Sequence, residues 1–184
     1  ADIWLWNPQS KIKTRKVTDT SKTSEYSPTP LPFDKESIAT VRVEDDGTQR
    51  LWRYHSKSGF SLLFEKIKPV GYHVWSGQNV ALFVLGEPHQ LQITGLDQKQ
   101  SKLIDSNIGR CLQNVPDSQA ISYTRESQDK WLLKSFDFAS RETQTLMELP
   151  GVSEDYVWYS KQQVIASDGD KLLIYDGLGN KQWQ

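Results

Sequence analysis

The sequence predicts an all-β fold, a β-propeller of four-stranded antiparallel blades, from three observations. Short strings that open a strand recur along the chain, apolar strings typical of a later strand recur in step with them, and no stretch keeps the apolar period of a helix over three turns. The strand-opening strings are Ser24-Glu25-Tyr26-Ser27, Val70-Gly71-Tyr72-His73, Ile108-Gly109-Arg110-Cys111 and Ser153-Glu154-Asp155-Tyr156. Their second residues are 46, 38 and 45 residues apart, and a strand-rich repeat of roughly 40–45 residues indicates propeller blades.

The apolar strings mark the third strand of each blade. They are Ile3-Trp4-Leu5-Trp6, Leu51-Trp52-Arg53-Tyr54, Leu91-Gln92-Ile93, Leu132-Leu133-Lys134 and Leu172-Leu173-Ile174-Tyr175. Their first residues are 48, 40, 41 and 40 residues apart, so this repeat has nearly the same period as the first. A β-rich run that we interpret as the second strand precedes each of the last four strings: Ser37–Val43, Val80–Leu85, Ala120–Thr124 and Gln163–Ala166.

Taken in order, the chain is predicted to form a single propeller domain, 1–184, with a half blade (1–20), three full blades (21–67, 68–106 and 107–150) and a last blade (151–184). In the half blade, the alternation of Lys11–Lys16 predicts a strand with one solvated face. Within later blades, Asp46-Gly47 and Asp168-Gly169 provide the positive φ angle that tight hairpin turns need.

The outer strands complete the blades. We interpret Phe60–Phe64 and Thr143–Leu149 as such strands, whereas the fourth strand of the last blade could only be the tail Lys181–Gln184. The two ends do not complement each other as one shared blade, which would remove the exposed sheet edges. The sequence therefore favours about four and a half blades that form a portion of a larger, six-bladed ring. The alternative is an irregular five-bladed closed ring.

Five of the seven tryptophans recur at blade positions. We expect them to fill the space between neighbouring sheets: Trp4, Trp52, Trp75, Trp131 and Trp158. Trp6 and Trp183 lie near the ends of the sequence and could be exposed.

Composition and charge exclude several functional classes. The chain has 22 basic and 23 acidic residues and a net charge of −1, so no overall field would attract nucleic acid or an anionic membrane. No run approaches the length of a membrane-spanning helix, and no charged segment followed by an apolar one indicates a signal peptide, so any export signal has been removed or was never there. Cys111 is the only cysteine, and we expect it to be a small buried side chain rather than a nucleophile.

The blade pattern resembles the TolB-like propeller repeats of exported bacterial proteins. A Ser-Pro pair that opens a blade, an Asp-Gly turn and an apolar–aromatic pair in the third strand carry the resemblance: Tyr26-Ser27-Pro28, Asp46-Gly47, Leu51-Trp52 and Ile174-Tyr175. Longer strings resemble an uncharacterised subset: Thr48–Arg53, Pro69–Trp75, Phe83–Pro88 and Glu154–Trp158. The resemblance implies a six-bladed ring and a periplasmic or otherwise exported location, but no activity.

The strand-opening strings should lie together at the mouth of the central channel. There we expect Glu25, Glu154 and Asp155 to accept hydrogen bonds, Arg110 to pair with an anionic group, and Tyr72 and His73 to orient a ligand. Tyr26 belongs to the same level of the first string, and Glu87 could reach the same mouth as Tyr72. Because strand side chains alternate between faces, not all of them can point into the channel.

The sequence leaves three functions open. The first is a non-catalytic propeller that binds a protein, a peptide or a small polar ligand, without cofactor, metal or catalytic residues. The second is a metal-assisted hydrolase or lyase acting on a glycan, with His73 as ligand or base. The third is a structural or regulatory segment of a larger exported protein, in which Arg110 with Glu154 or Asp155 is only a structural ion pair.

Overall fold

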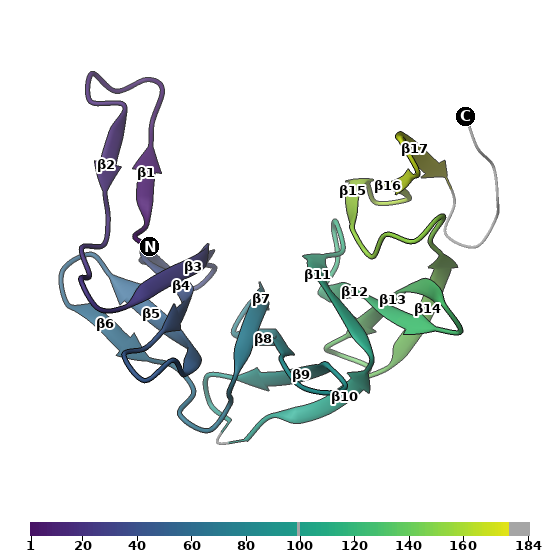
Figure 1. Ribbon diagram of the computed structural model, residues 1–184, viewed down its shortest axis with the longest axis horizontal. Helices are drawn as coiled ribbons and strands as arrows, with labels where there is room; N and C mark the ends of the chain where they lie inside the picture. Colours follow the sequence, from purple (N-terminus) through teal and green to yellow (C-terminus); the bar gives the residue numbers. More distant parts are fainter. Residues whose placement is uncertain (99, 177–184) are drawn as a thin grey trace. The chain divides into compact units, whose positions relative to one another are not determined.

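A computed structural model describes residues 1–98 and 100–176, and every regular element in this part of the chain is a β-strand (Figure 1). The chain divides into two compact units, Ala1–Gly71 and Tyr72–Gln184. The boundary falls inside one strand, β7 (Val70–Ser76). Each unit is described by itself.

The first unit contains a two-stranded sheet and a four-stranded sheet, both antiparallel. The small sheet pairs β1 (Trp4–Trp6) with β2 (Thr14–Lys16). The larger sheet has the order β3-β4-β5-β6, with strands Ser24–Leu31, Asp34–Val43, Gln49–His55 and Gly59–Leu62. Gly47 has a φ angle of 82° in the turn between β4 and β5, as the Asp46-Gly47 pair predicts.

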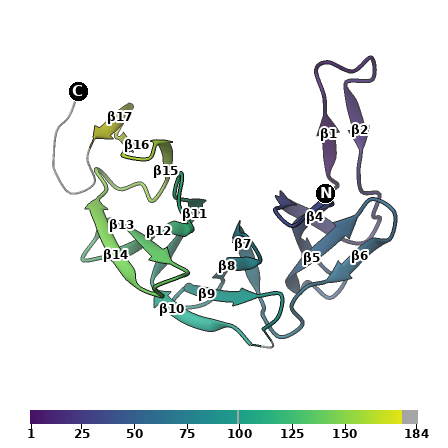
Figure 2. The same ribbon diagram turned by 180° about the vertical axis from the view of Figure 1, so that it is seen from behind.

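The second unit contains three antiparallel sheets that follow one another along the chain (Figure 2). The first has the order β7-β8-β9-β10, in which β8 is Asn79–Val84, β9 is Gln90–Gly95 and β10 is Lys102–Ser106. The second has the order β11-β12-β13-β14, with strands Ile108–Asn114, Ala120–Ser127, Lys130–Asp137 and Thr143–Glu148. The third consists of β15 (Tyr156–Ser160), β16 (Gln163–Asp168) and β17 (Lys171–Asp176).

These sheets confirm the predicted fold class, because each four-stranded sheet is an up-and-down meander within one predicted blade. The last blade has three strands in the described residues, and its predicted fourth strand, Lys181–Gln184, lies outside them. The string Ser153–Tyr156 was expected to open a strand, but β15 begins only at Tyr156. The residues before it form a connection.

Apolar side chains pack between consecutive sheets of the second unit. One cluster joins the first and second sheets: Val74, Ala81, Phe83, Leu91, Ile108, Ile121, Tyr123 and Phe136. Another joins the second and third sheets: Leu133, Leu149, Tyr156, Val164, Ala166 and Tyr175. Face-to-face packing of this kind fixes consecutive sheets relative to one another. The strand ends of neighbouring sheets are therefore held in fixed positions side by side.

The tryptophan prediction holds only in part. Trp75 is buried, with 2% of its surface exposed. Trp4, however, is 60% exposed, so its assignment to the core is wrong. It lies on the two-stranded sheet, whose short strands β1 and β2 are exposed along their whole length.

Candidate functional site

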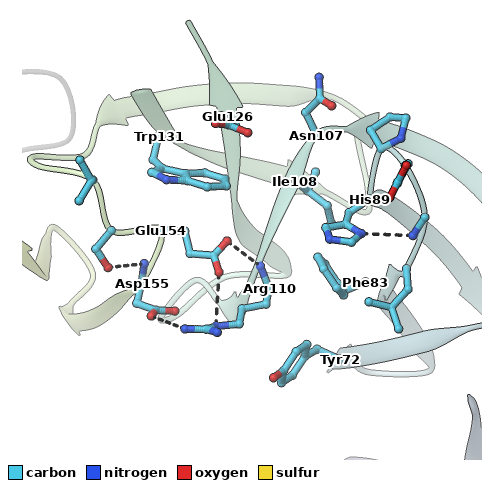
Figure 3. A pocket seen from close by; sticks show the side chains of 16 residues that line it. Tyr72, Phe83, His89, Asn107, Ile108, Arg110, Glu126, Trp131, Glu154 and Asp155 are labelled. Carbon is cyan, nitrogen blue, oxygen red and sulfur yellow. Dashed lines mark hydrogen bonds and ion pairs between the residues drawn. The ribbon is translucent and has the colours of Figure 1, made fainter. Parts of the chain in front are cut away.

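A pocket of about 1080 Å³ lies in the second unit, between the first two sheets and the connection that leads to the third (Figure 3). In an antiparallel meander, the start of the first strand, the hairpin between the second and third strands and the end of the fourth strand meet at one edge of the sheet. The lining follows this rule, since it comes from the start of β7 and β11, the β8–β9 and β12–β13 hairpins, and the β10–β11 and β14–β15 connections. The lining includes Tyr72, Glu87, His89, Arg110, Glu126, Trp131, Glu154 and Asp155.

Arg110 projects from β11 and pairs with two carboxylates that precede β15. Its Nε lies 3.3 Å from Glu154 Oε1, and its Nη2 lies 3.0 Å from Asp155 Oδ2. The hydrogen bond to Asp155 raises the pKa of the guanidinium, and the charge of Glu154 acts in the same direction. The single guanidinium or ammonium group that residues 1–98 and 100–176 contribute to the lining is therefore already compensated within the protein.

An irregularity in β11 gives Arg110 and Glu154 their positions. Ile108 pairs with Arg125 and Leu112 with Tyr123, so the three residues between them face a single residue of β12, Thr124. Such a bulge bends the strand and redirects its side chains. The Arg110 backbone N–H consequently points away from β12 and donates to Glu154 Oε2 at 3.2 Å.

Gly109 makes room for this contact. A Cβ atom at this position would overlap both Glu154 Oε2 and Thr124 Oγ1. A glycine lets another group approach the backbone closely, and here that group is the protein's own carboxylate.

One wall of the pocket consists of three rings from the first sheet of the unit. Tyr72 is edge-on to Phe83 with their centroids 5.8 Å apart, and Phe83 lies 4.9 Å from the His89 ring. His89 Nδ1 accepts a hydrogen bond from the Gly86 N–H at 3.2 Å, which leaves Nε2 as the protonated nitrogen of the neutral ring. Glu87 is exposed in the same loop, and it lines the pocket together with Tyr72 as expected.

The opposite wall belongs to the second sheet. Trp131 is half-buried there, and its Cα partner across the β12–β13 ladder is Glu126. Residues directly opposite each other in a ladder project from the same face, so the indole and the carboxylate are neighbours. Asn107 contributes from the β10–β11 connection, where its φ angle of 58° is one that asparagine tolerates better than most residues.

Five of the eight predicted binding residues line this pocket: Tyr72, Glu87, Arg110, Glu154 and Asp155. His73 does not, because it follows Tyr72 in the extended strand β7 and therefore points to the other face, where it is buried. His89, Asn107, Glu126 and Trp131 line the pocket but were not predicted to do so. His89, Glu126 and Trp131 lie in or beside the hairpin between the second and third strands of a sheet, as Glu87 does, so a signal for these three was present in the sequence.

Glu25 and Tyr26 belong to the first unit. Tyr26 is 49% exposed, whereas the Glu25 side chain is fully buried. The Glu25 carboxylate accepts hydrogen bonds from three hydroxyls and lies 3.4 Å from a guanidinium nitrogen: its partners are Thr18, Thr20, Thr23 and Arg42. These contacts tie the segment after β2 to the four-stranded sheet.

In 1–98 and 100–176, no group of three or more His, Cys, Asp or Glu side chains is arranged to hold a metal ion. In the same part of the chain, no helix is long and apolar enough to cross a membrane.

No protein-family model matches the sequence, and no curated protein matches it significantly. Among solved structures, the chain is similar to an oligogalacturonate lyase in complex with manganese, with a TM-score of 0.70 and 14% identity over 93% of this chain and 55% of that one. It is similar to TolB from Acinetobacter baumannii, with a TM-score of 0.66 and 14% identity over 95% and 46%. It is also similar to the β-propeller domain of the Trilobed protease from Pyrococcus furiosus, with a TM-score of 0.63 and 17% identity over 89% and 57%.

The chain thus spans about half the length of each of these three proteins, which agrees with the prediction of a partial propeller. At this level of identity, the likeness concerns the fold alone. The fold of the chain is a TolB-like β-propeller.

Proposed function

We propose that the chain is a non-catalytic propeller that binds a peptide, a protein segment or another small polar ligand in the pocket described above. The observation that carries the proposal is the lining itself, in which charged groups and aromatic rings from two consecutive sheets and carboxylates from the connection to the third converge on one open space. Sites that orient a ligand combine apolar walls with a few fixed polar groups. A packed set of sheets supports this role, because it holds those groups in place before a ligand arrives.

The openness of the site favours a large ligand over a small enclosed one. Most of the charged side chains that line it are exposed, among them Glu87, Arg110 and Asp155. A segment of peptide can contact all of these groups at once, whereas a small molecule would leave many of them in water. By the resemblance to TolB-like repeats, we further propose that the protein is periplasmic or otherwise exported.

A peptide-display selection on the full chain tests the proposal. We expect enriched peptides that bind the wild type and lose at least roughly tenfold in affinity when Tyr72 or Trp131 is replaced by alanine, since buried aromatic anchors carry much of the energy of an interface. The control is Tyr159→Ala, because Tyr159 is also exposed but lies outside the lining. The proposal would be contradicted if the peptides bound the Tyr72, Trp131 and Tyr159 variants with the same affinity as the wild type, or if the selection enriched no peptide.

A lyase or hydrolase acting on a glycan remains a second candidate, because the fold is similar to that of an oligogalacturonate lyase in complex with manganese. The pocket histidine for such a reaction would be His89 rather than His73, since only His89 lines the pocket. Oligogalacturonate incubated with the protein, with and without Mn²⁺, would then give unsaturated products that depend on His89. A chain that neither binds peptides nor cleaves this glycan would favour the third function, a structural or regulatory segment of a larger exported protein.

A further inference from the structure

The charges of the pocket are strongly unequal. Among the described residues, four carboxylates line it, from Glu87, Glu126, Glu154 and Asp155, against the one guanidinium of Arg110. The neighbouring basic groups do not change this balance. Lys130 lies 2.7 Å from Glu148, and Arg125 lies 3.1 Å from Asp105, which it shares with Lys134; none of these three cations lines the pocket.

Two of the four carboxylates remain available. Arg110 pairs with Glu154 and Asp155, whereas Glu87 and Glu126 form no ion pair with any residue of 1–98 or 100–176. The interior of the pocket therefore carries a net negative charge that attracts cations and repels anions.

The aromatic rings beside the free carboxylates point to the kind of cation. Glu126 is the cross-strand neighbour of Trp131, and Glu87 shares its loop with His89, whose ring packs against Phe83. An ammonium or guanidinium group gains from the face of an indole as well as from a carboxylate. A divalent metal ion needs several oxygen or nitrogen ligands, and the described residues offer no cluster of three for one.

We propose that the pocket selects a peptide segment through the ammonium or guanidinium group of a lysine or arginine side chain, held by Glu126 with Trp131 on one wall and by Glu87 on the other. This inference rests on the proposed binding function and specifies its ligand. It also reverses the expected role of Arg110. Arg110 does not attract an anionic ligand, because Glu154 and Asp155 compensate its charge. It opposes a cationic ligand, because it occupies these two carboxylates.

The test uses four synthetic peptides with blocked ends that differ only in charge. Each is a hexapeptide of alternating glycine and a second residue, which is lysine, arginine, glutamine or glutamate. Titration calorimetry on the full chain at 20 mM NaCl is expected to show binding of the lysine and arginine peptides and none of the glutamate peptide. Raising NaCl to 200 mM should weaken binding roughly threefold or more, because exposed charges are screened over shorter distances.

Charge-removing variants locate the site. Glu87→Gln and Glu126→Gln should each lower the affinity for the lysine peptide roughly two- to fivefold, the range for a single exposed ion pair. Glu142→Gln is the matched control, since Glu142 is exposed and lies outside the lining, and it should change nothing. Arg110→Gln should strengthen binding of the lysine peptide, because it frees Glu154 and Asp155.

The outcomes separate this inference from the function on which it rests. If the glutamine or glutamate peptide binds as well as the lysine peptide, the pocket binds ligands but does not select cations, and the inference fails alone. If Glu142→Gln lowers the affinity for the lysine peptide as much as the pocket variants do, the attraction is non-specific and the inference also fails. If no peptide binds at any salt concentration and display selection enriches none, the proposed function fails with it.

Discussion

The carboxylate of Glu154 occupies the place that a side chain on Gly109 would need. An added Cβ atom would overlap Glu154 Oε2, which also accepts a hydrogen bond from the Arg110 N–H. We expect Gly109→Ala to destabilise the fold by about 1–3 kcal/mol, the usual range for overpacking a site whose neighbours are fixed. Urea denaturation of the variant, measured as the free energy of unfolding, checks this prediction.

The Glu154→Ala background provides the control. Without the carboxylate, the new methyl group still overlaps Thr124 Oγ1 and lies close to the Cβ of residue 154, but its worst overlap is gone, so Gly109→Ala should be less destabilising there than in the wild type. Equal effects in the two backgrounds would mean that Glu154 and Gly109 are not coupled.

Ion pairing at Arg110 should contribute little to stability. Its side chain is 55% exposed, and that of Asp155 is 54% exposed, so water screens their attraction. We expect Arg110→Gln to change the free energy of unfolding by less than about 1 kcal/mol. A loss of several kcal/mol in chemical denaturation would instead assign Arg110 a structural role.

The repeats were sufficient to predict the blades, because strands and turns can be recognised from nearby residues and their spacing gives the length of a blade. The strand boundaries of the site were less accessible. Glu154 and Asp155 were predicted within a strand, in which successive side chains would point to opposite faces, but they lie in the connection before β15 and both reach Arg110. Whether both carboxylates reach Arg110 depends on the three-dimensional path of that connection.

Two other outcomes depended on information that the sequence holds only partly. Strand alternation separates Tyr72 from His73, but it does not say which of the two faces the pocket. Trp131 matched the core pattern of the repeat, yet it lies near the β12–β13 hairpin, where the indole is only half-buried and lines the pocket. Burial at a sheet edge depends on the neighbouring sheet, which a local pattern does not describe.

The Cys111 thiol should react slowly in the folded protein. Burial raises its pKa, although its sulfur lies within hydrogen-bond distance of the Tyr156 carbonyl oxygen and the Gln113 side-chain nitrogen. Since the thiolate is the reactive form, alkylation by iodoacetamide at pH 8 should be much slower in native buffer than in urea. Mass spectrometry of timed samples measures both rates, and similar rates would show that the thiol is accessible and ionised in the fold.

Asp105 joins the first and second sheets of the second unit, and its removal should be more damaging than that of any pocket carboxylate. Its Oδ2 accepts hydrogen bonds from Lys134 Nζ at 2.6 Å and from the Tyr123 hydroxyl at 2.9 Å, and only 14% of its side chain is exposed. Asp105→Asn leaves the buried Lys134 without its partner, so we expect a loss of about 2–4 kcal/mol in the free energy of unfolding. The exposed Asp170→Asn is the control and should change it by less than about 0.5 kcal/mol.

The effect of Asp105 should also depend on pH in a defined direction. Burial acts to raise the pKa of this carboxyl, but the hydrogen bonds from Lys134 and Tyr123 outweigh it and hold the pKa below its ordinary value of 3.8. A carboxyl whose pKa is lower in the folded state contributes its full stabilisation above its unfolded pKa and loses it as the pH falls through the folded pKa. The difference in unfolding free energy between the wild type and Asp105→Asn should therefore be constant from pH 7 to about pH 5 and shrink below about pH 4. Denaturation curves at several pH values measure this difference, and one that grows on acidification would contradict the assignment of Asp105 as the charged centre between the two sheets.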